Sequence, residues 1–543
     1  MRVEDIGWKA SGKVGAVAAG GAGAVEAGIR TLEAGGNAAD GAVATILALQ
    51  VTDHGACCIG GEVPLLIYDA KQGEVKSLSG MGRAPLSQDA IDWYMANGIP
   101  GPGDIRMAPV PSVADLCLTT LKVYGTMSLE QVVTPTLEIL DQISAGQKPS
   151  QDRWEPKLAA TLRKLVDEER LTDGSREDRI QAACDRFYGR NHRCSDVAED
   201  LEKDWIDAGG FLRLEDLRQH RTRIEDPITV AYKGYTVAKC DTWTQGPMLL
   251  QALRLVEGFD LSAMGHNSTD TIHVIIEALK LAMADRDAFY ADPEFVDVPI
   301  EALLSDAYTE IRRPLIDLTT ASRAARPGDP STMTPVLDGG VFHPWGEGTT
   351  TCVVADKWGN VVAATPSANV DRSYTTGGRT GVTYGNRLRS LNTMLGHPNC
   401  IQAGKRPRIT LTPTLVLKDG KPVLGISIAG GDRQDQTALN LLLDFIDFGM
   451  TPEEAVTAPR FCTFHHQNSF DPNPQRDQTF LESGELEINE TIDASIRDEL
   501  IRRGHPLRVV TKGAISNPSM LHIDGDTFHV AGDPGARRHS AAI

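Results

Sequence analysis

The sequence has no long run of apolar residues and no excess of positive charge. The longest apolar stretch, GAVATILALQV at 41–51, is too short to cross a bilayer, and the N-terminal MRVEDIGWKASGK has no apolar segment typical of a signal peptide. The formal net charge is -19, which argues against a surface that neutralises nucleic-acid phosphates. We therefore expect a cytoplasmic protein with neither a membrane nor a nucleic acid as partner.

Paired cysteines and metal-ligand spacings are also missing. The nine cysteines are scattered and form no CxxC pair, which favours reduced, mostly buried thiols. His343, His397 and the adjacent His465 and His466 lack the spacing of metal ligands. The glycine-rich GGAGAVEAG near the N-terminus lacks the GxGxxG spacing of a dinucleotide loop. We expect no metal and no cofactor.

What is present is a mixture of helix and strand patterns. The helix patterns include an Ala- and Leu-rich segment at 33–51 capped by Asn37, charged amphipathic segments within 145–232, and a long helix at 271–289. The strand patterns are a strand–turn–strand at 63–80, a hairpin around Gly359, and a second hairpin that ends at Gly430 and Gly431 before another helix pattern. A stretch rich in Pro, Gly, Ser and Thr at 319–348 predicts a long exposed loop.

Three consecutive threonines, Thr349 to Thr351, directly follow that loop and open a strand pattern. A threonine hydroxyl is a weak nucleophile without a neighbouring base, but the α-amine of an N-terminal threonine can be that base. The reference pKa of such an amine is about 8, so part of it is unprotonated near neutral pH. Because Gly348 leaves the preceding peptide room, we predict self-cleavage between Gly348 and Thr349.

The second requirement is a place for the oxyanion of a tetrahedral intermediate. The backbone N–H groups of Gly430 and Gly431, at a strand end before a helix, fit that role. The pattern alone leaves another interpretation open, because threonines are also typical of half-buried strands that have no catalytic role.

The segment from Thr349 resembles the nucleophile segment of the γ-glutamyltranspeptidase family of N-terminal-nucleophile hydrolases. The matching residues are Thr349, Thr350, Val353, Val354, Asp356, Lys357, Gly359 and Asn360. Further segments similar to the family follow in family order, namely AGGNAADGAVAT, TWTQGPMLLQ, EALKLAMADRDAFYADP, AGKRP and TPEEAVTAPRF.

The resemblance implies roles for particular residues. Thr349 falls on the nucleophile, Ser367 on a residue whose hydroxyl contacts the nucleophile's amine, and Asn369 on a substrate-contacting residue, while Gly430 and Gly431 match the oxyanion glycines. The implied fold is α+β, a four-layer αββα sandwich formed from a self-cleaved precursor. A large subunit, 1–348, and a small subunit, 349–543, would form one structural domain, and the pair could assemble further into a homo-oligomer.

The sequence departs from the glutathione-cleaving members at the positions that bind the glutamyl group. Met81 stands where those members have an Arg, with Arg83 two residues later. In GNRLRS, Arg387 and Ser390 replace two acids that bind the α-ammonium group. An arginine in place of these acids disfavours an ammonium group, so we expect an acyl group without one, which could carry a carboxylate that Arg387 binds.

Thr410 follows Ile409 where the family has paired serines, and with Arg387 and Arg83 it is a candidate to bind substrate. Both arginines could equally be structural ion-pair residues. The predicted activity is an amidohydrolase or acyltransferase on a small-molecule amide. Its acyl group could be glutamyl, or the enzyme could be an oxamate amidohydrolase-like or cephalosporin acylase-like member. A more remote alternative is an inactive relative that binds a small ligand.

Overall fold

The computed structural model describes residues 3–146, 153–191, 194–337, 349–368, 370, 376–511 and 513–543. Two seven-stranded sheets dominate the described chain. The first has the order β17 (His539–Ala542), β2 (Gly15–Ala19), β8 (Cys352–Asp356), β9 (Val361–Ala364), β3 (Val63–Asp69), β4 (Glu74–Gly80) and β5 (Ile224–Glu225). The second has the order β1 (Lys9–Gly12), β16 (Thr527–Gly532), β15 (Asn517–Asp524), β11 (Lys421–Ala429), β10 (Thr414–Lys418), β7 (Tyr235–Lys239) and β6 (Ile228–Tyr232).

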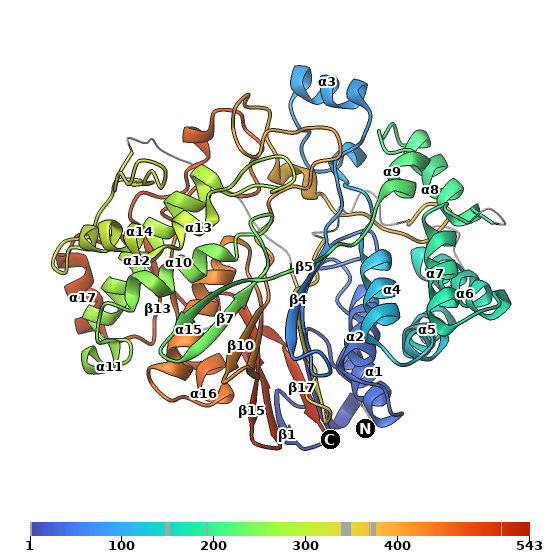
Figure 1. The fold of residues 1–543 in the computed structure, drawn as a ribbon, viewed down its shortest axis with the longest axis horizontal. Coiled ribbons are helices and arrows are strands. Elements are labelled where there is room, and N and C mark those ends of the chain that lie inside the picture. The colour runs from blue at the N-terminus through green and yellow to red at the C-terminus, as the bar shows by residue number, and fades with distance from the viewer. Residues whose placement is uncertain are drawn as a thin grey trace.

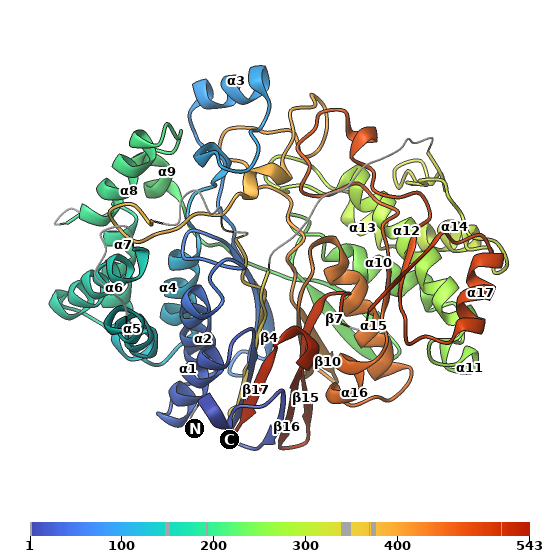
Figure 2. The ribbon, with the colours of Figure 1, turned by 180° about the vertical axis from the view of Figure 1, so that it is seen from behind.

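Helices lie on both sides of the two sheets (Figure 1). One side carries α1 (Ala22–Glu33), α2 (Ala38–Thr52), α4 (Val113–Tyr124), α5 (Leu129–Ala145), α6 (Trp154–Leu171), α7 (Arg176–Phe187), α8 (Asp196–Asp207) and α9 (Leu214–Gln219). The other carries α10 (Pro247–Val256), α11 (Leu261–Met264), α12 (Thr269–Phe289), α13 (Ile300–Leu303), α14 (Asp306–Arg312), α15 (Gln434–Ile446), α16 (Pro452–Thr457) and α17 (Ala494–Arg502). Both views show α3 (Gln88–Asn97) at the top, away from the strands (Figure 2).

A third, small sheet joins β12 (Phe461–Thr463), β13 (Leu486–Asn489) and β14 (Leu507–Val510). Its β13–β14 pair is parallel, whereas the neighbouring strands of both large sheets run antiparallel. Antiparallel strands can follow one another through short turns, which suits the two predicted hairpins.

The local sequence explains where several elements begin and turn. Asn37 caps α2 because its side chain accepts a hydrogen bond from the backbone N–H of Asp40, while the Asp40 carboxylate accepts one from the Asn37 N–H. Gly359, at φ +93°, makes the turn between β8 and β9. The predicted strand–turn–strand at 63–80 and both later hairpins are confirmed as β3–β4, β8–β9 and β10–β11.

Three apolar cores show how the layers pack. Residues of both large sheets, including Leu66, Val353, Leu415 and Leu521, form one core. A second core joins the first sheet to α1, α2 and α4, and a third joins the second sheet to α10, α12 and α15. Helix α2 is buried over almost its whole length, which fits its position between β8 and α5. The mixture of helices and sheets confirms the α+β prediction.

Each large sheet draws strands from both sides of the predicted cleavage position. In the first sheet β8 lies between β2 and β9, and β9 pairs with β3. In the second, β10 pairs with β7, and β16 pairs with β1. A break before Thr349 would therefore leave the two pieces hydrogen-bonded to each other within both sheets.

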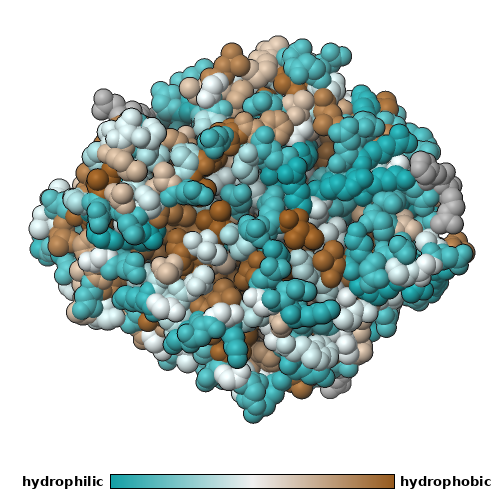
Figure 3. All heavy atoms as spheres, in the orientation of Figure 1, coloured by the Kyte–Doolittle hydropathy of each residue, from teal (hydrophilic) through white to brown (hydrophobic). Residues whose placement is uncertain are grey.

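The outer surface agrees with the charge pattern of the sequence. Hydrophilic side chains cover most of the right-hand side of Figure 3, where α5 to α9 lie in Figure 1. In the described part of the predicted loop, 319–337 contains neither helix nor strand. No helix among the described residues is long and apolar enough to span a membrane.

Candidate functional site

Thr349 lies at the approach to a central strand of the first sheet. It is buried, three residues before β8, and the backbone N–H of Thr350 donates to the carbonyl of Pro366 at 2.9 Å. The Oγ1 atom of Thr349 lies 3.1 Å from the Oγ of Ser367, and either hydroxyl can be the donor. The structure thus brings together two residues that the resemblance also placed together, although the observed contact is between their hydroxyl groups and the implied one is between the Ser367 hydroxyl and the amine of Thr349.

Ser367 is held by a residue that the sequence analysis did not single out. Its backbone N–H and carbonyl both pair at 2.9 Å with the carbonyl and N–H of Glu62, which precedes β3. The Glu62 side chain accepts from Arg387 Nε at 2.7 Å, and Arg387 Nη2 donates to Ser367 Oγ at 2.9 Å. A chain of contacts therefore runs from Glu62 through Arg387 and Ser367 to Thr349.

The Glu62–Arg387 pair is fully enclosed. Glu62 is 0% exposed and Arg387 is 1% exposed, and the guanidinium also lies over the ring of Phe470, with 5.4 Å between Cζ and the ring centroid. Burial raises the pKa of Glu62, and the charge and hydrogen bonds of Arg387 oppose that rise. Two atoms of the pair, Glu62 Oε2 and Arg387 Nη1, have no hydrogen-bond partner among the described residues. The Nε and Nη2 edge of Arg387 is engaged, which leaves Nη1 for any other acceptor.

Gly430 and Gly431 form the turn between β11 and α15. Gly430 has φ +157° and Gly431 has φ +53°, and a Cβ on Gly430 would lie 2.3 Å from Ser516 Oγ. Only glycine adopts this pair of conformations readily. The side chain of Gln434, the first residue of α15, reaches back to within 3.5 Å of Thr349 Oγ1.

A buried network of charged and polar side chains holds the glycine turn through Asp432. Asp432 accepts from Arg286 Nη1 at 2.5 Å, and the same nitrogen donates to Gln245 Oε1 at 2.7 Å. Burial works to raise the pKa of Asp432, but the charges of Arg286, His466 and Arg408 together with the Ser469 hydrogen bond outweigh it and lower the pKa to about 2. Asp432 is therefore ionised at neutral pH and ties the glycine turn to α12.

A cavity of about 610 Å³ opens at Thr349. Its lining includes Gly430, Asp53 and Arg538. Arg538 lies directly before β17, donates to the Thr349 carbonyl at 3.3 Å and to Thr350 Oγ1 at 3.4 Å, and pairs with Asp53 at 3.3 Å. Burial lowers the pKa of Arg538, and the Asp53 carboxylate opposes that shift. The cavity is therefore polar, and a cation holds the backbone of the predicted nucleophile.

The remaining predicted residues divide into three groups. Thr410 is buried, its Oγ1 has no hydrogen-bond partner among the described residues, and it lies one residue after the Ile409 that pairs with Thr244. Arg83 hydrogen-bonds to the carbonyl of Gly404 at 3.2 Å and to Glu294 at 2.8 Å, and no described contact joins it to Thr349. Asn369 and Gly348 lie outside the described residues, so only Thr349 of the predicted cleavage site is described.

Sequence reasoning missed Glu62, Gln434 and Arg538. Glu62 had a weak signal, because an acid between Gly61 and Val63 interrupts an otherwise apolar strand start. Arg538 had none, since its contact with Thr349 spans 189 positions of the chain.

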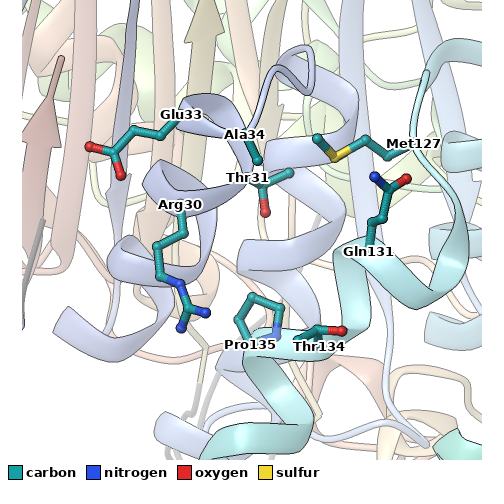
Figure 4. A pocket seen from close by; sticks show the side chains of 8 residues that line it. All are labelled: Arg30, Thr31, Glu33, Ala34, Met127, Gln131, Thr134 and Pro135. Atoms are coloured by element: carbon teal, nitrogen blue, oxygen red, sulfur yellow. The ribbon is translucent and has the colours of Figure 1, made fainter.

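A second cavity, of about 580 Å³, lies between α1 and α5 (Figure 4). Arg30 and Glu33 come from α1, and Gln131, Thr134 and Pro135 from α5. Its lining contains none of the predicted site residues, so the cavity at Thr349 is the better candidate site. Among the described residues no group of three or more His, Cys, Asp or Glu side chains could hold a metal ion.

Comparisons with known proteins agree with the resemblance noted in the sequence. The family model described as gamma-glutamyltranspeptidase matches residues 24–142 and 147–543. The glutathione hydrolase proenzyme of Bacillus subtilis (strain 168) is 30% identical over 483 residues, which cover 83% of this chain and 81% of the relative. The acylase ACY 1 proenzyme of Pseudomonas sp. (strain V22) is 29% identical over 514 residues, covering 88% and 84%.

A solved structure, the cephalosporin acylase from Bacillus halodurans, superimposes with a TM-score of 0.81 at 25% identity over 98% of this chain and 97% of that one. The predicted resemblance is thus confirmed over nearly the full length. The chain belongs to the gamma-glutamyltranspeptidase family.

Proposed function

We propose that this protein is an amide-cleaving enzyme whose nucleophile is Thr349, freed by self-cleavage after Gly348. The observation that carries the proposal is the 3.1 Å approach of Thr349 Oγ1 to Ser367 Oγ at a cavity that Gly430 also lines. Relatives named as hydrolase and acylase proenzymes support amide chemistry and a precursor. The four-layer αββα sandwich and the two-subunit division at 348/349 are part of the same proposal.

In the proposed reaction the freed α-amine of Thr349 takes the hydroxyl proton while Oγ1 attacks the amide carbonyl. The N–H groups of the glycine turn stabilise the oxyanion, and one lost donor of this kind typically costs about 100- to 1,000-fold in rate. The C–N bond then breaks, the amine returns the proton to the leaving nitrogen, and an ester to Thr349 remains. Water, or an acceptor amine, cleaves the ester and restores the hydroxyl.

For the substrate we propose an acyl group that carries no free ammonium. The Glu62 carboxylate near the nucleophile is already neutralised by Arg387 at 2.5 Å, so it offers little net attraction to a cation. Arg387 Nη1 has no hydrogen-bond partner among the described residues and could donate to a carbonyl or carboxylate of the acyl group. The acylase relatives favour this interpretation, while the glutathione hydrolase relatives favour a glutamyl group.

The cleavage is tested by electrophoresis and N-terminal sequencing of the purified protein. We expect two fragments, 1–348 and 349–543, with the smaller one beginning at Thr349. The Thr349→Ala variant is expected to remain a single, inactive chain, because it has no hydroxyl to attack. An active protein whose Gly348–Thr349 bond is intact would refute the proposal.

The substrate class is tested with two amides that differ only in the α-amino group, γ-glutamyl-p-nitroanilide and glutaryl-p-nitroanilide. We expect kcat/KM for the glutaryl compound to be at least about tenfold higher, because an ammonium group would lose its hydration without gaining an unpaired carboxylate. Adding glycylglycine then separates transfer from hydrolysis, since only transfer accelerates p-nitroaniline release. A preference for the γ-glutamyl compound would assign the glutamyl alternative.

A further inference from the structure

The side chain of Gln434 lies between the proposed nucleophile and the proposed oxyanion donor. It is 1% exposed, and one atom of its amide group is 3.5 Å from Thr349 Oγ1. Which amide atom is nitrogen and which is oxygen follows from the surrounding hydrogen bonds.

Only one orientation satisfies the amide. The nitrogen then donates to the carbonyls of Ile428 at 3.0 Å and Thr410 at 3.3 Å, and the oxygen accepts from the N–H of Gly431 at 3.1 Å. In the opposite orientation nitrogen would face the Gly431 N–H and oxygen would face two carbonyls. The atom beside Thr349 Oγ1 is therefore the amide oxygen, and the same oxygen occupies the Gly431 N–H.

This position matches the one that the carbonyl oxygen of a substrate needs. An acyl group attacked by Thr349 must place its carbonyl oxygen near the nucleophile and on an oxyanion donor. Gln434 already presents an amide carbonyl oxygen there, and it provides the partner that a buried N–H requires.

We propose that the Gln434 carbonyl is a resident occupant of the oxyanion position, which the substrate carbonyl must displace. The proposal rests on the proposed function, since it concerns the same reaction. Exchanging one neutral amide acceptor for another gains little in the ground state. The stronger, charge-assisted bond of Gly431 N–H forms only when the oxyanion develops, so its energy lowers the barrier rather than KM.

The test compares Gln434→Met and Gln434→Glu with the wild type, using glutaryl-p-nitroanilide. Met keeps the length of the side chain but lacks a strong acceptor, so we expect KM to fall about threefold or more with kcat changed less than threefold. Glu places a charged acceptor on Gly431 N–H and opposes the oxyanion. We expect its kcat/KM to fall about 100-fold or more and to recover partly as the pH is lowered.

Gln436→Met is the matched control. Gln436 is also buried in α15 and bonded to backbone groups, donating to the Thr463 carbonyl at 3.0 Å and accepting from the Thr463 N–H at 2.7 Å. Its removal should lower the thermal midpoint of unfolding and leave KM unchanged. Any variant is first shown to be cut at Thr349, which establishes that it folds.

Two kinetic results for Gln434→Met would overturn the inference. If KM and kcat are both unchanged in Gln434→Met, Gln434 has only a structural role. If kcat falls while KM is unchanged, Gln434 donates a hydrogen bond to the transition state. Crystals of the wild type treated with phenylmethylsulfonyl fluoride give an independent answer. We expect a sulfonyl oxygen on Gly431 N–H with Gln434 displaced, and Gln434 remaining at 3.1 Å would contradict the proposal. A wild type never cut at Thr349 would instead refute the proposed function.

Discussion

The buried Glu62–Arg387 pair allows a quantitative prediction about stability. Arg387→Met, made in the Thr349→Ala background that we expect to stay uncut, keeps most of the side-chain volume but leaves the 0% exposed Glu62 without its counter-charge. Breaking a buried pair from one side typically costs about 3–5 kcal/mol. At about 2.1 cal/mol/K per residue, unfolding of the 543-residue chain has an entropy of about 1.1 kcal/mol/K, so the thermal midpoint should fall by about 2.5–4.5 °C at pH 7.

The pH dependence of that loss identifies its cause. Burial raises the pKa of Glu62 and Arg387 holds it down, so removing Arg387 raises the pKa further. A carboxyl whose folded pKa exceeds its unfolded value binds a proton more readily in the folded state, and stability then increases as the pH falls. The deficit of Arg387→Met should therefore shrink between pH 7 and pH 5.

Differential scanning calorimetry at the two pH values measures this change. Arg83→Met is the matched control, because its pair with Glu294 is about one-fifth exposed and such pairs contribute about 1 kcal/mol or less. We expect a small loss from this control, equal at both pH values. An Arg387→Met deficit of the same size at pH 7 and pH 5 would refute the assignment of the loss to an uncompensated Glu62.

Two further predictions concern the surroundings of Thr349. Arg538→Gln removes a charged donor from the Thr349 carbonyl, and such bonds are worth about 1.5–3 kcal/mol. We therefore expect the small fragment to appear about 10- to 100-fold more slowly on gels. An unchanged rate would show that Arg538 does not assist the cleavage. Gly430→Ala places a Cβ 2.3 Å from Ser516 Oγ at φ +157°, so the turn should shift. We expect kcat in the p-nitroanilide assay to fall by about 100-fold or more, because an oxyanion donor moves. The double variant Gly430→Ala/Ser516→Gly should recover part of this loss. Recovery to full activity would show that steric contact alone matters.

The sequence was sufficient for features that depend on neighbouring residues. The cap at Asn37, the turn at Gly359 and the burial of α2 each follow from a pattern a few residues long, and the structure confirms them. The order of family segments supplied the long-range part of the fold, because local periodicity does not say which strands pair. The roles assigned to the site residues stay predictions.

The site itself depends on contacts that no local pattern encodes. Glu62 and Arg387 are 325 positions apart, and backbone pairing places Glu62 beside Ser367. The sequence leaves two interpretations of Arg387 open, a ligand for a substrate carboxylate and a structural ion-pair residue. In the structure Glu62 and Ser367 occupy its Nε and Nη2 edge, and Nη1 has no hydrogen-bond partner among the described residues. The sequence did not identify these partners, because counting charges along a chain does not show which group a buried charge meets.

The three consecutive threonines now have separate explanations. Each hydroxyl meets a different polar group, and the pairs are Thr349 with Ser367 at 3.1 Å, Thr350 with Arg538 at 3.4 Å, and Thr351 with Ser519 at 2.9 Å. Ser519 belongs to β15 of the second sheet, and Arg538 precedes β17 of the first, so the segment before β8 is held from both sheets. Because all three threonines are buried, each hydroxyl needs a partner whatever its role. If Thr349 becomes a chain end as proposed, its contact with Ser367 and the bond from the Thr350 N–H to the Pro366 carbonyl would keep its hydroxyl in place.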